Sequence, residues 1–131
     1  MYKATVYTEI SHEVKIVVKP TFMENESDII AGKYVFVYFI TIENLGNESV
    51  QLLRRHWTIT DSTGESYEIN GDGVVGRQPV IQPGKTHSYN SYCVLKSMAG
   101  HMQGHYEMRR NSGEQIEVSI PRFSLRAHLL N

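Results

Sequence analysis

The chain has 131 residues, of which 40% are hydrophobic and 21% charged, and its formal net charge is −1 at pH 7. A chain of this length buries about two-thirds of the surface that it exposes when unfolded, so we expect one domain, residues 1–131, with its own core. No basic run exceeds the pairs Arg54-Arg55 and Arg109-Arg110, which argues against a nucleic-acid partner.

The single cysteine, Cys93, cannot form a disulfide within the chain, and this favours a reducing compartment. No apolar run approaches the roughly 18 residues of a membrane span. The first twenty residues scatter charges where a signal peptide needs an apolar core. We therefore expect a cytoplasmic protein with no membrane partner.

Strong strand signals begin near the N-terminus. Residues 13–22 alternate apolar and polar side chains, the period of two that a half-buried strand shows. Pro20 within this run predicts an edge or a bend, because proline cannot donate a hydrogen bond to a neighbouring strand. Residues 34–43 (YVFVYFITIE) are almost all β-branched or aromatic, which predicts a central strand that is apolar on both faces.

The rest of the chain predicts short strands separated by turn residues. These strands cover residues 50–60, 65–69, 86–95, 101–109, 115–120 and 123–128, with a short strand around Val80. Residues 70–84 are rich in glycine and proline, which excludes an ordinary helix and predicts a long loop. Seven to eight antiparallel strands without an amphipathic helix predict an all-β, immunoglobulin-like sandwich.

The glycine-rich segment contains the pattern G-x-G-x-x-G at Gly71, Gly73 and Gly76. In dinucleotide-binding folds these glycines join a strand to a helix whose N-terminus holds the pyrophosphate. Here Pro79 and Pro83 leave no room for that helix, so the sequence argues against this fold. The favoured interpretation is that the glycines permit positive φ angles in a loop of the sandwich.

The same segment leaves one alternative open. Successive backbone N–H groups, together with Arg77, could hold a phosphate without a helix. The carboxylate of Asp72 argues against this anion cradle, because it would repel the ligand.

Six histidines raise the question of a metal site. His101 and His105 are four residues apart, and on a strand they would be about 13 Å apart, too far to share an ion whose ligand bonds are about 2 Å. Alternation places His101, Gln103, His105 and Glu107 outward and Met102, Gly104, Tyr106 and Met108 inward. We expect surface histidines, with no metal and no cofactor.

The sequence offers no arrangement that predicts catalysis. Cys93 lies within a strand beside apolar neighbours, which predicts a buried and unreactive thiol. No G-x-S-x-G nucleophile motif occurs, and the carboxylates are dispersed. Trp57, on a central strand, is expected in the core. We expect no catalytic residue and no enzyme activity.

Four blocks of sequence support a family resemblance. They are LLRRHWTITDSTG, GDGVVGRQPVIQPGK, YNSYCVLKSMAGHMQGHYEM and IPRFSL, and they lie within residues 50–125, a span of over half of the chain. In these blocks, and in YVFVYFITIEN, the chain resembles the ApaG family of small bacterial proteins. It departs from the family at Lys96-Ser97, where a threonine is common, and at His101 and His105.

The resemblance implies a fibronectin type III-like β-sandwich. It also implies an association with cobalt resistance and magnesium transport. Related domains occur in eukaryotic F-box and polymerase-interacting proteins, which suggests a protein-interaction module. The family supplies no established catalytic residues.

We therefore expect a non-enzymatic binding domain whose partner is another protein, and which is a monomer or a weak homodimer. The alternative is a protein that binds phosphate, pyrophosphate or a nucleotide through residues 71–77. The candidate ligand-binding residues are Gly71, Asp72, Gly73, Gly76 and Arg77.

Overall fold

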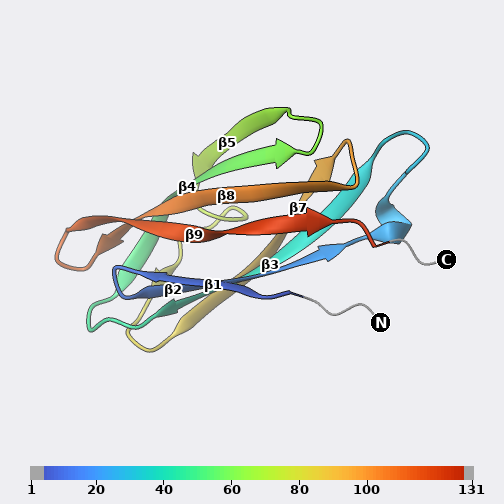
Figure 1. Cartoon of the computed structure of the whole chain (residues 1–131). Helices are drawn as coiled ribbons and strands as arrows, with labels where there is room; N and C mark the ends of the chain where they lie inside the picture. The colour runs from blue at the N-terminus through green and yellow to red at the C-terminus, as the bar shows by residue number, and fades with distance from the viewer. Residues whose placement is uncertain (1–4, 129–131) are drawn as a thin grey trace.

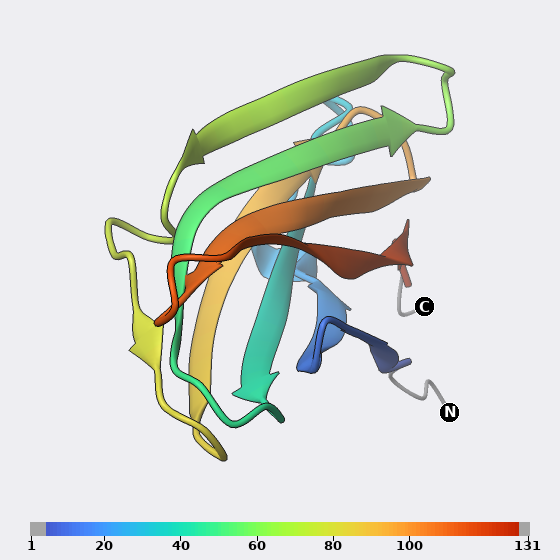
Figure 2. The ribbon, with the colours of Figure 1, turned by 90° about the vertical axis from the view of Figure 1, so that its left-hand side faces the viewer.

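The computed structural model describes residues 5–128, which form two antiparallel β-sheets (Figure 1). The elements are β1 (Tyr7–Ser11), β2 (Val14–Phe22), the 3-10 segment η1 (Glu24–Glu26), β3 (Tyr34–Asn44), β4 (Val50–Asp61), β5 (Ser66–Asp72), β6 (Val80–Ile81), β7 (Thr86–Leu95), β8 (Ala99–Arg110) and β9 (Gln115–Arg126). One sheet has the order β1-β2-β3-β7, and the other has the order β5-β4-β8-β9, with β6 also paired to β4. The two sheets face each other (Figure 2), which confirms the predicted β-sandwich.

Most predicted strands are confirmed, but three predictions need correction. β1 was missed, because a five-residue strand with only one aliphatic side chain gives almost no periodic signal. β5 runs to Asp72, so it enters the segment predicted as a loop. The last two predicted strands form one strand, β9, because a register shift opposite Met102–Gly104 lets the chain continue past Pro121.

Pro20 lies at a local edge, as its residue type predicts. The pairing of β1 with β2 ends at Tyr7 and Val18, so beyond that point, among residues 5–128, β2 pairs only with β3. The missing N–H of Pro20 therefore removes no hydrogen bond from a central position.

Aromatic side chains from both sheets meet in the core. The ring of Trp57 on β4 lies 5.4 Å from that of Tyr38 on β3 and 5.9 Å from that of Phe123 on β9. Aromatic pairs at such distances stabilise a core by more than their buried area alone. Trp57 is 3% exposed, which confirms its expected place in the core.

Cys93 lies on the inner face of β7 and is 6% exposed. Burial raises the pKa of its thiol to about 12, so the thiol stays protonated at neutral pH. The prediction that this cysteine is buried is confirmed.

The two long sides of the sandwich differ. On one side, β1 lies beside β9 (Figure 1), where the Ser119 N–H donates a hydrogen bond to Ser11 Oγ at 3.0 Å. On the other side, Tyr67 and Ile69 point from β5 toward the space between the sheets yet are 44% and 41% exposed. The sandwich is therefore closed at β1 and β9 and splayed at β5.

The sequence predicts that β3 is apolar on both faces, and the structure buries the inner face but covers the outer face only in part. Its inner row is buried, whereas Val35, Val37 and Phe39 alternate with that row and point outward from the sheet. Phe39 is 47% exposed. The described residues form two layers, so the second apolar face of β3 is covered only in part: Val35 is buried, whereas Phe39 lies at the surface.

Candidate functional site

Within the glycine-rich segment, residues 74–77 form a hairpin with a two-residue turn. The Val74 N–H donates to the Arg77 carbonyl at 2.8 Å, and the Arg77 N–H donates to the Val74 carbonyl at 3.0 Å. Val75 and Gly76 occupy the two central positions with φ angles of 47° and 75°. Two positive φ angles are typical of a type I′ turn, and a β-branched residue is uncommon in that conformation.

Gly73 occupies a position where no other residue fits. Its φ is 62°, and a Cβ atom there would lie 2.1 Å from the Arg77 carbonyl oxygen. Its N–H donates to the Leu53 carbonyl at 2.8 Å and so fastens the hairpin to β4. The expectation that these glycines permit positive φ is confirmed at Gly73 and Gly76.

Gly71 has a different role, which involves Arg55. Arg55 pairs with Gly71 on β5 and with the buried Tyr106 on β8, so its side chain points between the sheets. A Cβ atom at Gly71 would lie 2.9 Å from both terminal nitrogens of the guanidinium. Gly71 therefore makes room for an arginine on the inner side of β4.

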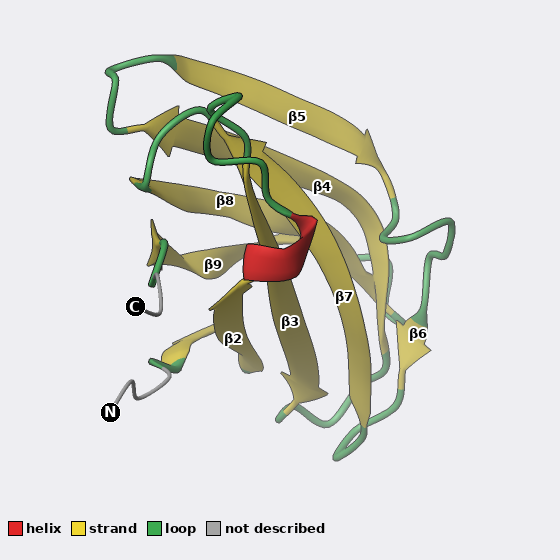
Figure 3. Ribbon diagram, turned by 90° about the vertical axis from the view of Figure 1, so that its right-hand side faces the viewer, coloured by secondary structure: helices red, strands yellow, loops and turns green. Residues whose placement is uncertain are grey.

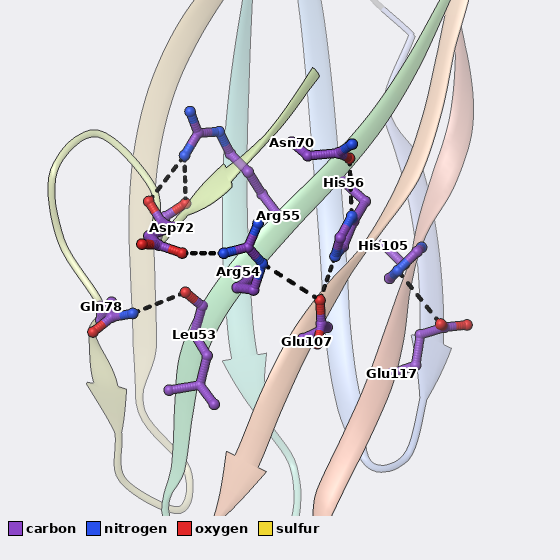
Figure 4. A network of polar contacts seen from close by, with 11 residues as sticks. Leu53, Arg54, Arg55, His56, Asn70, Asp72, Gln78, His105, Glu107 and Glu117 are labelled. Carbon is purple, nitrogen blue, oxygen red and sulfur yellow. Dashed lines mark hydrogen bonds and ion pairs between the residues drawn. The ribbon is translucent and has the colours of Figure 1, made fainter. Parts of the chain in front are cut away.

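The guanidinium of Arg55 holds the start of the hairpin. Its Nη1 donates to the carbonyl oxygens of Asp72, at 3.0 Å, and Gly73, at 2.9 Å (Figure 4). Hydrogen bonds from a charged donor are stronger than those between neutral groups. The carboxylate of Asp72 pairs with Arg54 on the outer side. The two consecutive arginines thus bind the same end of β5 from opposite faces.

The five residues predicted to bind a ligand lie in two different elements. Gly71 and Asp72 belong to β5, whereas Gly73, Gly76 and Arg77 belong to the hairpin that follows. Three N–H groups of the hairpin already donate to carbonyls. In the described chain, the N–H groups of Val75 and Gly76 have no backbone acceptor. Ligand binding by the five residues stays a prediction.

A second polar cluster covers the outer face of the five-stranded sheet. We call it the histidine–glutamate network, and it consists of Arg54, His56, Asp72, His105, Glu107 and Glu117 (Figure 4). The network results from the register between β4 and β8, because Arg54 pairs with Glu107 and His56 pairs with His105. Outward-facing residues of paired strands then meet side by side.

Charge pairs within the network satisfy one another. His56 Nε2 contacts Glu107 Oε2, and His56 Nδ1 lies 2.9 Å from Asn70 Oδ1. His105 Nε2 lies 3.4 Å from Glu117 Oε1. The hydrogen bond from His56 is the main cause that lowers the pKa of Glu107 below its ordinary value, and it outweighs the small effect of burial.

The histidine pair was missed by reasoning along one strand. The rings of His56 and His105 stack with centroids 4.5 Å apart, although the two residues are distant in sequence. His101 instead lies 3.2 Å from Arg122 Nη2. The sequence pattern places His105 outward, but its meeting with His56 depends on a register that no local signal provides. Within residues 5–128, no group of three or more His, Cys, Asp or Glu side chains could hold a metal ion.

The outer face of the other sheet carries an apolar row on β3 and β7, beside polar residues such as Lys19 and Thr41. Val35 and Val37 on β3 pair with Val94 and Tyr92 on β7, and Phe39 continues the row. We call these five residues the apolar strip. Phe39 and Tyr92 are 47% and 68% exposed. At one end of the strip, Met23 and Lys33 help to line a shallow hollow of about 330 Å³.

Its two antiparallel sheets and apolar outer strip place this chain among the small β-sandwich domains. Residues 24–110 match the family model described as the ApaG domain. Protein ApaG of Parvibaculum lavamentivorans is 44% identical over 120 residues, and Protein ApaG of Mesorhizobium japonicum is 43% identical over the same length. Each match covers 92% of both chains. The chain belongs to the ApaG family, as the sequence blocks indicated.

Solved structures agree with this assignment. A crystal structure of a Bordetella pertussis protein described as ApaA has a TM-score of 0.84 and 38% sequence identity, and the match covers 86% of this chain and 92% of that one. An X-ray structure from a structural genomics consortium has a TM-score of 0.83 and 39% identity, over 91% of this chain and 93% of the other. The described residues contain no helix long and apolar enough to span a bilayer.

The hairpin geometry predicts unequal costs for alanine at Gly73 and Gly76. Gly76→Ala meets no atom within 4 Å, so only its positive φ is penalised, by about 1–2 kcal/mol. Gly73→Ala should cost more, because its Cβ would also clash with the Arg77 carbonyl. Urea unfolding of the two variants and the wild type measures the difference. Unchanged stability in both variants would contradict this account of the turn.

The network predicts a pH-dependent contribution from Glu107. Its folded-state pKa is below the ordinary value of 4.5, so its interactions stabilise the fold above that value and are lost as the pH falls through the folded pKa. The wild type should therefore exceed Glu107→Gln in stability at about pH 6, and the difference should shrink toward about pH 3. Denaturant unfolding across this range tests the expectation, with the exposed Glu68→Gln on β5 as the matched control. A difference that does not change with pH would refute it.

Proposed function

We propose that this protein is a non-enzymatic binding domain that holds another protein against the apolar strip. The observation that carries the proposal is the contrast between the two outer faces of the sandwich. One face carries polar and charged groups that already pair with one another, and the other carries an apolar row in which Phe39 and Tyr92 are exposed. Apolar surface of this kind, ringed by polar groups, is typical of an interaction site.

The composition of the strip supports a protein partner. Interface centres are enriched in aromatic side chains and depleted of charge, with polar residues at the rim. Phe39 and Tyr92 are the large exposed side chains of the strip. Lys19 lies opposite Phe39 on β2, and Glu26 and Lys33 line the hollow at the other end. These three charged residues form the rim.

Several features support a binding role over catalysis. The only thiol is buried and protonated at neutral pH. Two tyrosine hydroxyls between the sheets, those of Tyr89 and Tyr106, bond to each other at 2.5 Å, and burial raises the pKa of both. A single buried thiol also suits a cytoplasmic protein. We infer that the association with cobalt resistance and magnesium transport, implied by family resemblance, acts through the partner.

The proposal predicts which variant loses the partner. Val37→Thr with Phe39→Thr replaces two strip residues by a β-forming polar residue and keeps the strand. Proteins cross-linked to the tagged wild type in its source cells should be depleted with this double variant. Quantitative mass spectrometry of the captured proteins measures the loss.

A matched control separates the strip from general apolar exposure. Leu45→Thr with Val80→Thr changes two residues that are 47% and 55% exposed and lie outside the strip, and it should capture the same proteins as the wild type. Equal capture by the strip variant and the wild type would contradict the proposal. So would a wild type that captures nothing above an untagged background.

A second candidate function is the binding of phosphate or pyrophosphate at residues 71–77. One observation favours it: the N–H groups of Val75 and Gly76 lack a backbone acceptor in the described chain, and Arg77 is exposed beside them. Under this proposal, pyrophosphate at about 100 times its dissociation constant adds about 2.7 kcal/mol to stability, and Arg77→Gln reduces that gain. Thermal melts with millimolar pyrophosphate measure the effect. An unchanged melting temperature would exclude this function.

A further inference from the structure

β7 is an edge strand with an unusual lack of protection. It borders only β3, and in Figure 3 no strand of the same sheet lies beyond it. Its ten residues contain no Lys, Arg, Asp, Glu or Pro, and all ten pair with β3 without a register shift. Within residues 5–128, its backbone forms no hydrogen bond outside that ladder. Every second residue therefore directs unpaired backbone groups outward.

The other edges carry the features that usually prevent strand pairing. β1 is short and contains Glu9. β5 contains Glu68 and Asp72, and β9 contains Glu117 and a bulge at Pro121. Charges, short length, prolines and bulges are the means by which proteins block an exposed edge. β7 has none of them.

We propose that β7 pairs antiparallel with β7 of a second copy of this chain, about a two-fold axis at Tyr92. This pairing sets Asn90 opposite the partner's Val94 and Tyr92 opposite the partner's Tyr92. A two-fold contact places identical surfaces together, so a charged edge would meet its own charge. The uncharged β7 meets no such repulsion, which is the complementarity that favours a second copy as the occupant.

The position of the two-fold axis follows from the apolar strip. The strip lies along the C-terminal half of β7, at Tyr92 and Val94. Pairing centred at Tyr92 joins the strips of both copies across the new sheet and covers part of a side chain that is 68% exposed. A contact of one strand per copy is small, so the dimer forms weakly and depends on concentration. This inference goes beyond the proposed function, because the contact is made by the backbone edge of β7, although Tyr92 belongs to both surfaces.

Sedimentation equilibrium of the full chain tests the pairing. The wild type should dimerise reversibly as its concentration rises to the millimolar range. Tyr92→Lys places two ammonium groups opposite each other and removes a tyrosine pair, which should raise the dimer dissociation constant by about tenfold or more. Phe39→Lys is the matched control, because Phe39 lies on the same face but on β3, away from the edge. It should leave the dimer intact.

A cross-link tests the register. Residues opposite each other in antiparallel strands have Cα atoms within the range that a disulfide spans. In a Cys93→Ala background, Tyr92→Cys should form an intermolecular disulfide much faster than Phe39→Cys does. A wild type that stays monomeric at millimolar concentration overturns the proposal, whether or not it captures other proteins. A dimer that survives Tyr92→Lys, or that Phe39→Lys abolishes, overturns it as well.

Discussion

A sandwich of two sheets can cover only one face of each sheet, and this constraint shapes the surface of the protein. The inner faces of the two sheets cover each other and enclose a core that includes Trp57, Tyr38 and Phe123. The outer face of β4 and β8 satisfies it with charges that pair across the strands. β3 has apolar side chains on both faces, so its outer row needs cover that two layers cannot supply. The incomplete cover of this outer row is the reason to propose a protein partner.

The G-x-G-x-x-G pattern has a different structural role here from the one it has in nucleotide-binding folds. In a nucleotide-binding fold its glycines bring the backbone close to a phosphate. Here Gly71 gives space to the Arg55 guanidinium, and Gly73 lets the chain approach the Arg77 carbonyl. Arg55 in turn binds the carbonyls of Asp72 and Gly73. The guanidinium of Arg55 therefore binds the chain's own backbone, and Arg77 is the exposed cation of the segment.

Local patterns were enough to predict the strands and the core, because alternation and turn residues are properties of short segments. They placed Cys93 and Trp57 inside, and Met102, Tyr106 and Met108 on the inner face of β8. They failed where the outcome depends on register between strands. The stacking of His56 on His105 and the insertion of Arg55 beside Gly71 both arise from pairs distant in sequence. The continuity of β9 past Pro121 was missed because a bulge absorbs the proline.

The contrast between the closed and splayed sides bears on how the molecule fluctuates. β5 carries no buried side chain, and Tyr67 and Ile69 remain partly exposed where the sheets separate. Its attachment depends on the β4 ladder and on Arg54 and Arg55 near its end. Regions with few buried apolar contacts open at a free energy well below that of global unfolding. The amide hydrogens of β5 should therefore exchange with solvent while those of β3 and β8 stay protected.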